Sequence, residues 1–338
     1  MWRDRTREYQ LLGIAGRILP ANTSIGKEGR MPTYDPSENE TGEHRLHTAE
    51  SKGSPLSSQI EVDFGAISDQ GKVRTNNEDH YLVARCGRAL EPLLTNLTEG
   101  DLPTEFRETG YGLIVADGLG GEAAGELASR LAITTLVKLI IDVPDWILKF
   151  DERREKEAMR RADTYLRQVH ETLTQRAEAD AKLSGMSTTM TLATILGADG
   201  VVAHVGDSRA YLFRQGELHQ LTRDQTQAQM LLEAGVITKE EFAKNQYRHV
   251  LLQAIGGRGG LVDVEIHRTR FQHDDRLLLC TDGLTDMVED SKIAEVLGRD
   301  TSSQEACDSL LELALEAGGR DNVTAVLGHL RFPEADWF

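Results

Sequence analysis

The chain has 338 residues, enough for one large domain or two ordinary ones. Its 55 acidic and 38 basic residues give a formal net charge of −17, and it has no dense Lys/Arg block with interleaved aromatics, so nucleic acid is a poor partner. No apolar run approaches the roughly 20 residues that span a bilayer. Three widely spaced cysteines favour a reducing compartment. We therefore expect a cytoplasmic protein without membrane insertion.

Residues 1–58 are predicted to form a flexible, disordered leader. From residue 21 onward this segment is rich in Ser, Thr, Pro, Gly, Glu and Asn, and it cannot bury enough apolar surface to order itself. The earlier apolar stretch LLGIAGRILPA follows charged residues of both signs and is too broken for a secretion signal. Met31 is an alternative translation start, a hypothesis that the intact mass of the natural protein would decide.

The folded region is expected at residues 59–333 and begins with strands. IEVDFGAISDQG and HYLVA alternate around a turn, and YGLIVA is a short apolar run that ends at Asp117. Residues 86–109 are predicted as a surface insertion between strands. Residues 122–141 carry aliphatic side chains at helical spacing, and 151–182 are predicted to form a long charged helix with a solvated face.

The second half of the chain adds further strands. TMTLATILGADGVVAHVGDSRAYLFRQGELHQL contains several strands joined by glycine-containing turns, and RLLLC and VTAVLGHL are two more. The more polar, helical segment at about 225–260 is expected to form a flap, and two helical stretches lie within 291–317. Consecutive hairpins with helices grouped apart predict an α+β fold with antiparallel sheets.

Four aspartates stand at the start or end of an apolar strand, namely Asp79, Asp117, Asp282 and Asp321. Strand ends can hold carboxylates at fixed separations, as a metal site needs. Oxygen donors without nearby Cys or His favour Mg²⁺ or Mn²⁺ over Zn²⁺, and two such ions can activate a water and polarise a phosphoryl oxygen. This set points to a phosphoester hydrolase without a covalent nucleophile. For any one of these aspartates alone, a plain turn is the simpler interpretation.

Six sequence blocks resemble one known family. They are SDQGKVRTNNEDHYL (68–82), VADGLGGEAAGELAS (115–129), STTMTLA (187–193), HVGDSRAYLFRQGELHQLTRDQT (204–226), LLLCTDGL (277–284) and GGRDNVTAVL (318–327). In this order they resemble the metal-dependent Ser/Thr protein phosphatases (PPM, protein phosphatase type 2C) in their bacterial form. The resemblance implies a sandwich of two antiparallel β-sheets flanked by helices, in four αββα layers.

The matching motifs also imply a site. The ligands of two Mn²⁺ or Mg²⁺ ions would be Asp79, Asp117, Asp282, Asp321 and the carbonyl of Gly118, with Asp117 bridging both ions as a catalytic residue. Glu78 would act through water behind these ligands. Arg74 occupies the family's phosphate-binding position, where a planar guanidinium matches two phosphate oxygens. A surface arginine in a strand is the alternative interpretation of Arg74.

Two departures from the family pattern leave questions open. Leu119 stands where relatives carry His or Met and cannot donate a proton, so the general acid is unassigned. A further metal-binding aspartate near STT has no clear match, with Asp180 a remote candidate, so a third ion stays uncertain. Asp207 and Ser208 are interpreted as turn and core-bracing residues.

The implied function is a Ser/Thr phosphoprotein phosphatase of signal transduction that hydrolyses phosphoester by a water activated at a binuclear Mg/Mn centre. Its partners would be phosphorylated Ser/Thr proteins, including Ser/Thr protein kinases. Two alternatives stay open: a non-catalytic phosphoprotein-binding regulator and a metal phosphoesterase acting on small molecules. Retention of all four aspartates argues against the regulator, because an unneeded carboxylate cluster is costly to bury.

Overall fold

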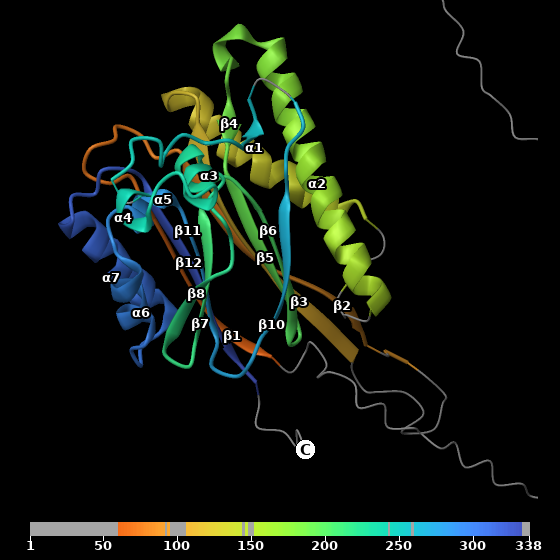
Figure 1. Cartoon of the computed structure of the whole chain (residues 1–338). Helices are drawn as coiled ribbons and strands as arrows, with labels where there is room; N and C mark the ends of the chain where they lie inside the picture. Colours follow the sequence, from red (N-terminus) through yellow and green to blue (C-terminus); the bar gives the residue numbers. More distant parts are fainter. Residues whose placement is uncertain are drawn as a thin grey trace, which may run out of the picture. The chain divides into compact units, whose positions relative to one another are not determined.

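The computed structural model describes residues 60–91, 93–94, 106–143, 146–147, 152–242, 244–257 and 260–332. The expected leader and the Met31 start lie outside the described residues. The described strands form two sheets, and every described strand pair is antiparallel (Figure 1). The α+β prediction with two antiparallel sheets is confirmed.

The first sheet is five-stranded. Its order is β1 (Glu61–Asp69), β12 (Val323–Arg331), β11 (Arg276–Cys280), β7 (Arg209–Arg214) and β8 (Glu217–Gln220). The two predicted apolar strands RLLLC and VTAVLGHL are its neighbouring members β11 and β12. Nearly every residue of these two strands is buried, because both faces of the sheet are covered.

The second sheet is seven-stranded. Its order is β10 (Glu265–Arg270), β6 (Asp199–Val205), β5 (Met190–Leu196), β3 (Phe106–Leu119), β4 (Ser187–Thr188) and β9 (Ile255–Gly256), with β2 (Asp79–Leu90) paired to β3. β2 and β3 form a long hairpin from Asp79 opposite Asp117 to Leu90 opposite Phe106. Strand pairing therefore extends into both ends of the range 86–109 that the sequence predicts as an insertion, because residues 86–90 belong to β2 and residues 106–109 to β3.

Helices cover the outer face of each sheet. The described helices are α1 (Glu122–Ile141), α2 (Glu152–Ala179), α3 (Gln227–Glu233), α4 (Lys239–Phe242), α5 (Asp282–Thr285), α6 (Asp290–Leu297) and α7 (Ser303–Glu316), with a short 3₁₀ turn η2 (Ala181–Leu183). Helices α1 and α2 confirm the two predicted at 122–141 and 151–182, and α6 and α7 those within 291–317. None of the helices in the described ranges has the length and apolarity that a membrane crossing requires.

Three clusters of buried apolar side chains fill the spaces between these layers. One packs α1 and α2 against the second sheet, and includes Leu136, Leu166 and Ile114. Another lies between the two sheets, where Leu113 and Leu279 meet. The third packs α6 and α7 against the first sheet. The order helix, sheet, sheet, helix is the predicted four-layer arrangement (Figure 1).

The end of β3 approaches the first turns of α1 at backbone distance. A Cβ built on Gly118 would lie 2.1 Å from Gly125 O and 2.8 Å from Glu78 O. Both atoms belong to backbone, which cannot move aside as the far end of a side chain could. Only glycine therefore allows β3, α1 and the start of β2 to meet here, beside Asp117.

We predict that Gly118→Ala lowers the free energy of unfolding by about 2 kcal/mol, because the added methyl group overlaps two backbone oxygens. Gly112→Ala is the matched control on the same strand, since a Cβ there meets no atom within 4 Å. That change should be neutral or stabilising, because glycine is unfavourable inside a strand. Urea unfolding measures both, and equal losses in the two variants would contradict the close approach at Gly118.

Candidate metal centre

Asp79 and Asp117 lie opposite each other where β2 begins and β3 ends. The backbone of Asp117 is fixed from two sides by threonines. Its N–H donates to Thr189 Oγ1 at 3.0 Å, and its carbonyl accepts from Thr188 Oγ1 at 2.7 Å and from the backbone N–H of Thr189 at 2.9 Å. The position of this carboxylate is thus set by the sheet and not by a mobile loop.

Asp282 and Asp321 come from the other sheet. Asp282 is the first residue of α5, directly after β11, and Asp321 comes just before β12. Thr281, which precedes Asp282, joins the sheets: its Oγ1 donates to Asp79 Oδ2 at 2.8 Å and accepts from the backbone N–H of Thr324 at 3.0 Å. This link brings the Asp282 segment and the start of β2 together.

Burial and the negative charges of neighbouring predicted aspartates raise the pKa of both Asp79 and Asp117. Burial raises the pKa of Asp79 to about 7, and the negative charges of Asp282 and Asp321 add to the increase. Burial also raises the pKa of Asp117 well above its ordinary value. The negative charges of neighbouring aspartates raise it further, namely those of Asp79, Asp282, Asp207 and Asp321. Such mutual repulsion within a buried site is relieved by cations.

The donor set fits hard divalent cations. Asp79 Oδ1 is buried and has no hydrogen-bond partner, although Oδ2 of the same carboxylate is bonded to Thr281. A buried, unpaired carboxylate oxygen costs free energy unless a ligand completes it. Carboxylate oxygens are the ligands that Mg²⁺ and Mn²⁺ prefer. The buried, unpaired oxygen of Asp79 therefore has the chemistry of a ligand for a hard divalent cation.

Glu78 lies between this cluster and α1. Its backbone N–H donates to Asn322 Oδ1 at 2.8 Å, and its carbonyl accepts from Ser129 Oγ at 2.5 Å. A Cβ on Gly125 would lie 2.3 Å from Glu78 Oε2, so the small residue in α1 leaves room for this carboxylate. Glu78, which precedes Asp79 in the chain, therefore packs against α1.

Arg74 lies at the exposed rim of the cluster. Its side chain is 55% exposed, and its Nη2 donates to Asp321 Oδ2 at 2.6 Å. The hydrogen bond to Asp321 raises the pKa of Arg74. Burial lowers this pKa, and the charges of Asp321, Glu78 and Asp117 raise it. The guanidinium is therefore close to the predicted cation ligands and open to solvent.

The structure adds residues that sequence reasoning missed. His249 of the flap region has Nδ1 3.5 Å from Asp282 Oδ2 and Nε2 3.4 Å from Asp286 Oδ2. One ligand atom from each of these three residues lies within 4.8 Å of the others, so they could hold a cation. Arg248 donates to Asp286 Oδ1. The spacing in TDGLTD, which puts an acid one helical turn after Asp282, was the available signal for Asp286.

Asp207 is buried, and its pKa is affected by this burial and by the charge of Asp282. Burial raises its pKa well above the ordinary value, and the charge of Asp282 is the next largest cause. The expected bracing role applies to Ser208, whose Oγ is 2.7 Å from Thr189 Oγ1. The remote candidate Asp180 instead caps η2 by accepting from the N–H of Lys182 at 3.0 Å.

Comparison with known proteins gives consistent matches. A family model described as protein phosphatase 2C matches residues 104–318. The serine/threonine protein phosphatase PstP of Mycobacterium tuberculosis is 36% identical over 265 residues, which are 78% of this chain and 44% of PstP. The chain therefore spans less than half the length of PstP. The serine/threonine phosphatase Stp of Listeria welshimeri is 33% identical over 260 residues, covering 77% of this chain and 92% of Stp.

Solved structures share the fold. A crystal structure of M. tuberculosis PstP/Ppp aligns with a TM-score of 0.64 at 35% identity, covering 80% of this chain and 99% of that chain. The PstP catalytic domain in complex with two manganese ions aligns with a TM-score of 0.63 at 34% identity, with the same coverage. The two antiparallel sheets with helices on their outer faces are the arrangement that this chain shares with these solved structures. The chain belongs to the protein phosphatase 2C family.

We predict that Asp79 destabilises the cation-free protein increasingly as the pH rises from about 4 to 7. Because the folded pKa of Asp79 is about 7 and the unfolded value is near 4, the folded state holds the extra proton between these values. The Asp79 contribution to stability is therefore present below pH 4 and is lost as the pH rises toward 7. In EDTA, Asp79→Asn should become more stable relative to wild type by at least about 1 kcal/mol across this window.

Comparison with the variant isolates this effect from the other carboxylates of the chain. Saturating Mn²⁺ should raise the Tm of wild type more than that of Asp79→Asn, because the variant lacks one anionic ligand. A stability difference between the two proteins that stays constant from pH 4 to 7 would show that Asp79 is not held among like charges.

Proposed function

We propose that the chain is a metal-dependent protein-serine/threonine phosphatase that hydrolyses phosphoesters at two Mn²⁺ or Mg²⁺ ions. The observation that carries this proposal is the buried carboxylate of Asp79, which lies opposite Asp117 and near the charges of Asp282 and Asp321. Its Oδ1 has no hydrogen-bond partner. Family membership and the two manganese ions named for PstP support it.

The proposed ligands are Asp79, Asp117, Asp282, Asp321 and the carbonyl of Gly118, with Asp117 between the two ions. When bound, the ions would lower the pKa of an attacking water and neutralise charge on the phosphoryl oxygens. Asp117 suits the bridging position because three hydrogen bonds to Thr188 and Thr189 fix its backbone. Rigid placement matters, because small displacements of reacting groups are costly in rate.

Arg74 is proposed to bind the substrate phosphate. Its exposed guanidinium can present two parallel N–H groups to phosphate oxygens while it remains beside Asp321. Glu78, held by Asn322 and Ser129, is proposed to orient water behind the ligands. Arg74 would thus position the phosphoester and Glu78 the water. The charge of the ions would stabilise the negative charge on the phosphoryl oxygens.

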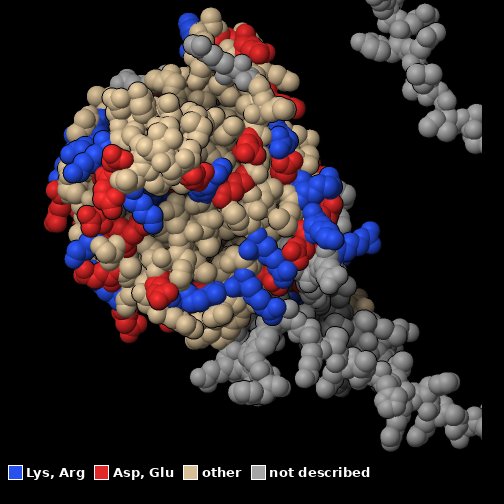
Figure 2. All heavy atoms as spheres, viewed as in Figure 1, with Lys and Arg blue, Asp and Glu red and all other residues tan. Residues whose placement is uncertain are grey.

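We further propose that the substrates are phosphorylated Ser/Thr proteins in the cytoplasm, including Ser/Thr protein kinases. The flap beside Asp282 exposes the apolar side chains of Tyr247, Val250 and Leu252, a surface suited to peptide flanking a phosphate. Lys and Arg side chains are mixed with Asp and Glu around a broad area without charged residues on the face drawn in Figure 2. Phosphoproteomics after gene deletion, with cell fractionation, tests the kinases and the compartment.

We predict different kinetic effects for the two kinds of site residue on a phosphothreonine peptide with Mn²⁺. Asp117→Asn should lower kcat at least about 100-fold with the fold retained, because it weakens the ligand shared by both ions. Arg74→Ala should chiefly raise KM, since it removes a phosphate contact at the rim. Steady-state kinetics and circular dichroism measure activity and folding in the same samples.

Asp180→Asn is the matched control, because Asp180 is exposed and caps a turn; it should keep near-normal kinetics. Near-normal turnover by Asp117→Asn would exclude the proposed ligand role. No turnover by the folded, Mn²⁺-loaded wild type would favour the phosphoprotein-binding regulator. Faster hydrolysis of small phosphate esters than of phosphopeptides would favour the small-molecule phosphoesterase.

A further inference from the structure

The turn between β6 and β7 packs against the threonine that holds Asp117. This turn contains Gly206 and Asp207, and both residues are buried. A Cβ built on Gly206 would lie 2.6 Å from Thr189 Cγ2, so the backbone of the turn lies directly on Thr189. Thr189 Oγ1 accepts from the N–H of Asp117 at 3.0 Å, and the N–H of Thr189 donates to the carbonyl of Asp117 at 2.9 Å. A displacement of the turn would therefore reach the proposed ligand Asp117 through Thr189.

Gln225 holds both backbone groups of Gly206. The N–H of Gln225 donates to Gly206 O at 2.7 Å, and Gln225 Oε1 accepts from the N–H of Gly206 at 2.9 Å. The carbonyl of Gly206 has a second neighbour, because His204 Nε2 lies 2.9 Å from it. The N–H has a single hydrogen to donate, and the Gln225 side chain accepts it. Without this side chain the buried N–H would lose its partner, which is costly, so the turn would shift.

Gln225 also lies where the flap leaves and rejoins the core. Its carbonyl accepts from the N–H of Leu252 at 2.8 Å, and its Nε2 donates to Asp263 O at 3.2 Å. The next residue, Thr226, caps α3 and forms a β-bridge with Leu251. Only 5% of Gln225 is exposed, so water competes little for these hydrogen bonds. One buried residue therefore joins the Gly206 turn to both ends of the flap.

The charges near the turn explain why it needs such support. Burial raises the pKa of Asp207 most, and the negative charge of Asp282 raises it next. The charge of Asp207 is in turn among those that raise the pKa of Asp117, after burial and the charges of Asp79 and Asp282. The turn thus carries a buried acid close to the proposed ligands, and repulsion between like charges favours moving it away. The hydrogen bonds of Gln225 oppose this movement from the outer side of the turn.

We propose that Gln225 is a positioning residue of the phosphatase reaction, which holds the Gly206 turn on Thr189 and thereby fixes the position of Asp117. Gln225 acts through these neighbours and does not itself bind an ion or the substrate. This role rests on the proposed phosphatase function and deepens it. Because Leu252 is bonded to the same residue, a shift of the flap would also move the turn beside the metal centre.

Gln225→Met tests this role, because methionine keeps the length of the side chain and offers at most a weak acceptor. We expect kcat to fall about ten-fold with a phosphothreonine peptide and with p-nitrophenyl phosphate alike, and the Kd for Mn²⁺ to rise by a similar factor. KM for the peptide should change little, because Arg74 is untouched. Steady-state kinetics measure kcat and KM, calorimetric titration measures Mn²⁺ binding, and circular dichroism checks folding.

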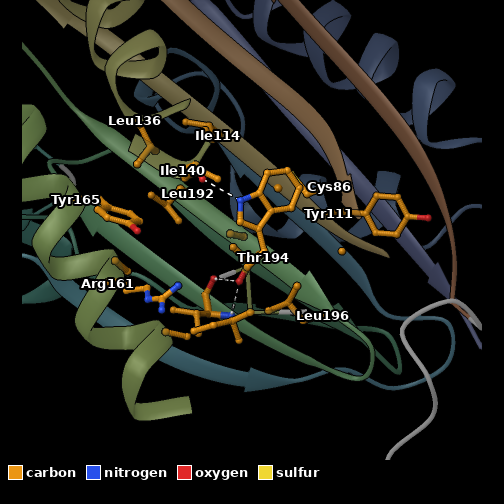
Figure 3. A pocket seen from close by; sticks show the side chains of 18 of the residues that line it. Cys86, Tyr111, Ile114, Leu136, Ile140, Arg161, Tyr165, Leu192, Thr194 and Leu196 are labelled. Atoms are coloured by element: carbon orange, nitrogen blue, oxygen red, sulfur yellow. Dashed lines mark hydrogen bonds between the residues drawn. The ribbon is translucent and has the colours of Figure 1, made fainter. Parts of the chain in front are cut away.

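Thr194 provides the matched control, because its hydroxyl also pairs with both backbone groups of a β6 residue. Thr194 Oγ1 accepts from the N–H of Val201 at 3.2 Å and donates to Val201 O at 3.4 Å. Figure 3 shows Thr194 among the residues that line an apolar pocket between α1, α2 and the second sheet. It pairs with Gly112, about 17 Å along β3 from Asp117. Thr194→Val should therefore leave kcat and Mn²⁺ binding unchanged.

Two further measurements separate positioning from a general loss of stability. Gln225→Glu can still accept from the N–H of Gly206, so it should retain more kcat than Gln225→Met. In EDTA, hydrogen exchange followed by mass spectrometry should be faster in Gln225→Met at residues 115–120 and 203–209, and unchanged there in Thr194→Val. This readout and Mn²⁺ binding need no turnover, so they test the role of Gln225 even if the wild type hydrolyses no phosphopeptide.

Three results would overturn the proposal. One is wild-type kcat and Mn²⁺ affinity in Gln225→Met, even with faster exchange, because Gln225 would then be structural alone. Another is an equal loss of kcat or Mn²⁺ affinity in Gln225→Met and Thr194→Val. The third is unchanged hydrogen exchange at residues 115–120 in Gln225→Met, which would show that the turn does not act on Asp117.

Discussion

The main physical constraint on this structure is the repulsion between aspartates that crowd together where the two sheets meet. Antiparallel register brings Asp79 opposite Asp117, and the neighbouring strands β11 and β12 bring Asp282 and Asp321 to the same region. Such a cluster opposes folding unless cations neutralise it. The apolar layers therefore hold in place an arrangement that the charges alone would disperse.

Polar contacts of buried backbone and side chains determine the geometry of this cluster. Thr281 links Asp79 of the second sheet to the backbone of Thr324 in the first, so the two proposed ligands Asp79 and Asp282 are held in a fixed relation. Gly118 permits the contact between β3 and α1 that no other residue could make. The proposed metal centre therefore depends on the same packing as the sandwich, because its proposed ligands lie at the ends of core strands.

Much of this could be predicted from the sequence, because it depends on local patterns. The apolar runs before Asp117 and Asp282 predicted strands, and the six ordered motif blocks indicated the four-layer fold. Other features could not, because they depend on tertiary proximity. His249 reaches Asp282 through the path of the flap, and Asp207 approaches it from β6 and β7. The extent of the β2–β3 hairpin was also missed, since the polar strand ends lack the apolar alternation of a buried strand.

The most direct test of the central claim is a crystal structure of the Mn²⁺-soaked protein with anomalous scattering recorded at the manganese edge. Two anomalous peaks should lie among the carboxylates of Asp79, Asp117, Asp282 and Asp321, with Asp117 contacting both. Peaks elsewhere on the molecule would show that these acids do not form a binuclear centre. The absence of any peak after a soak at a saturating Mn²⁺ concentration would show the same.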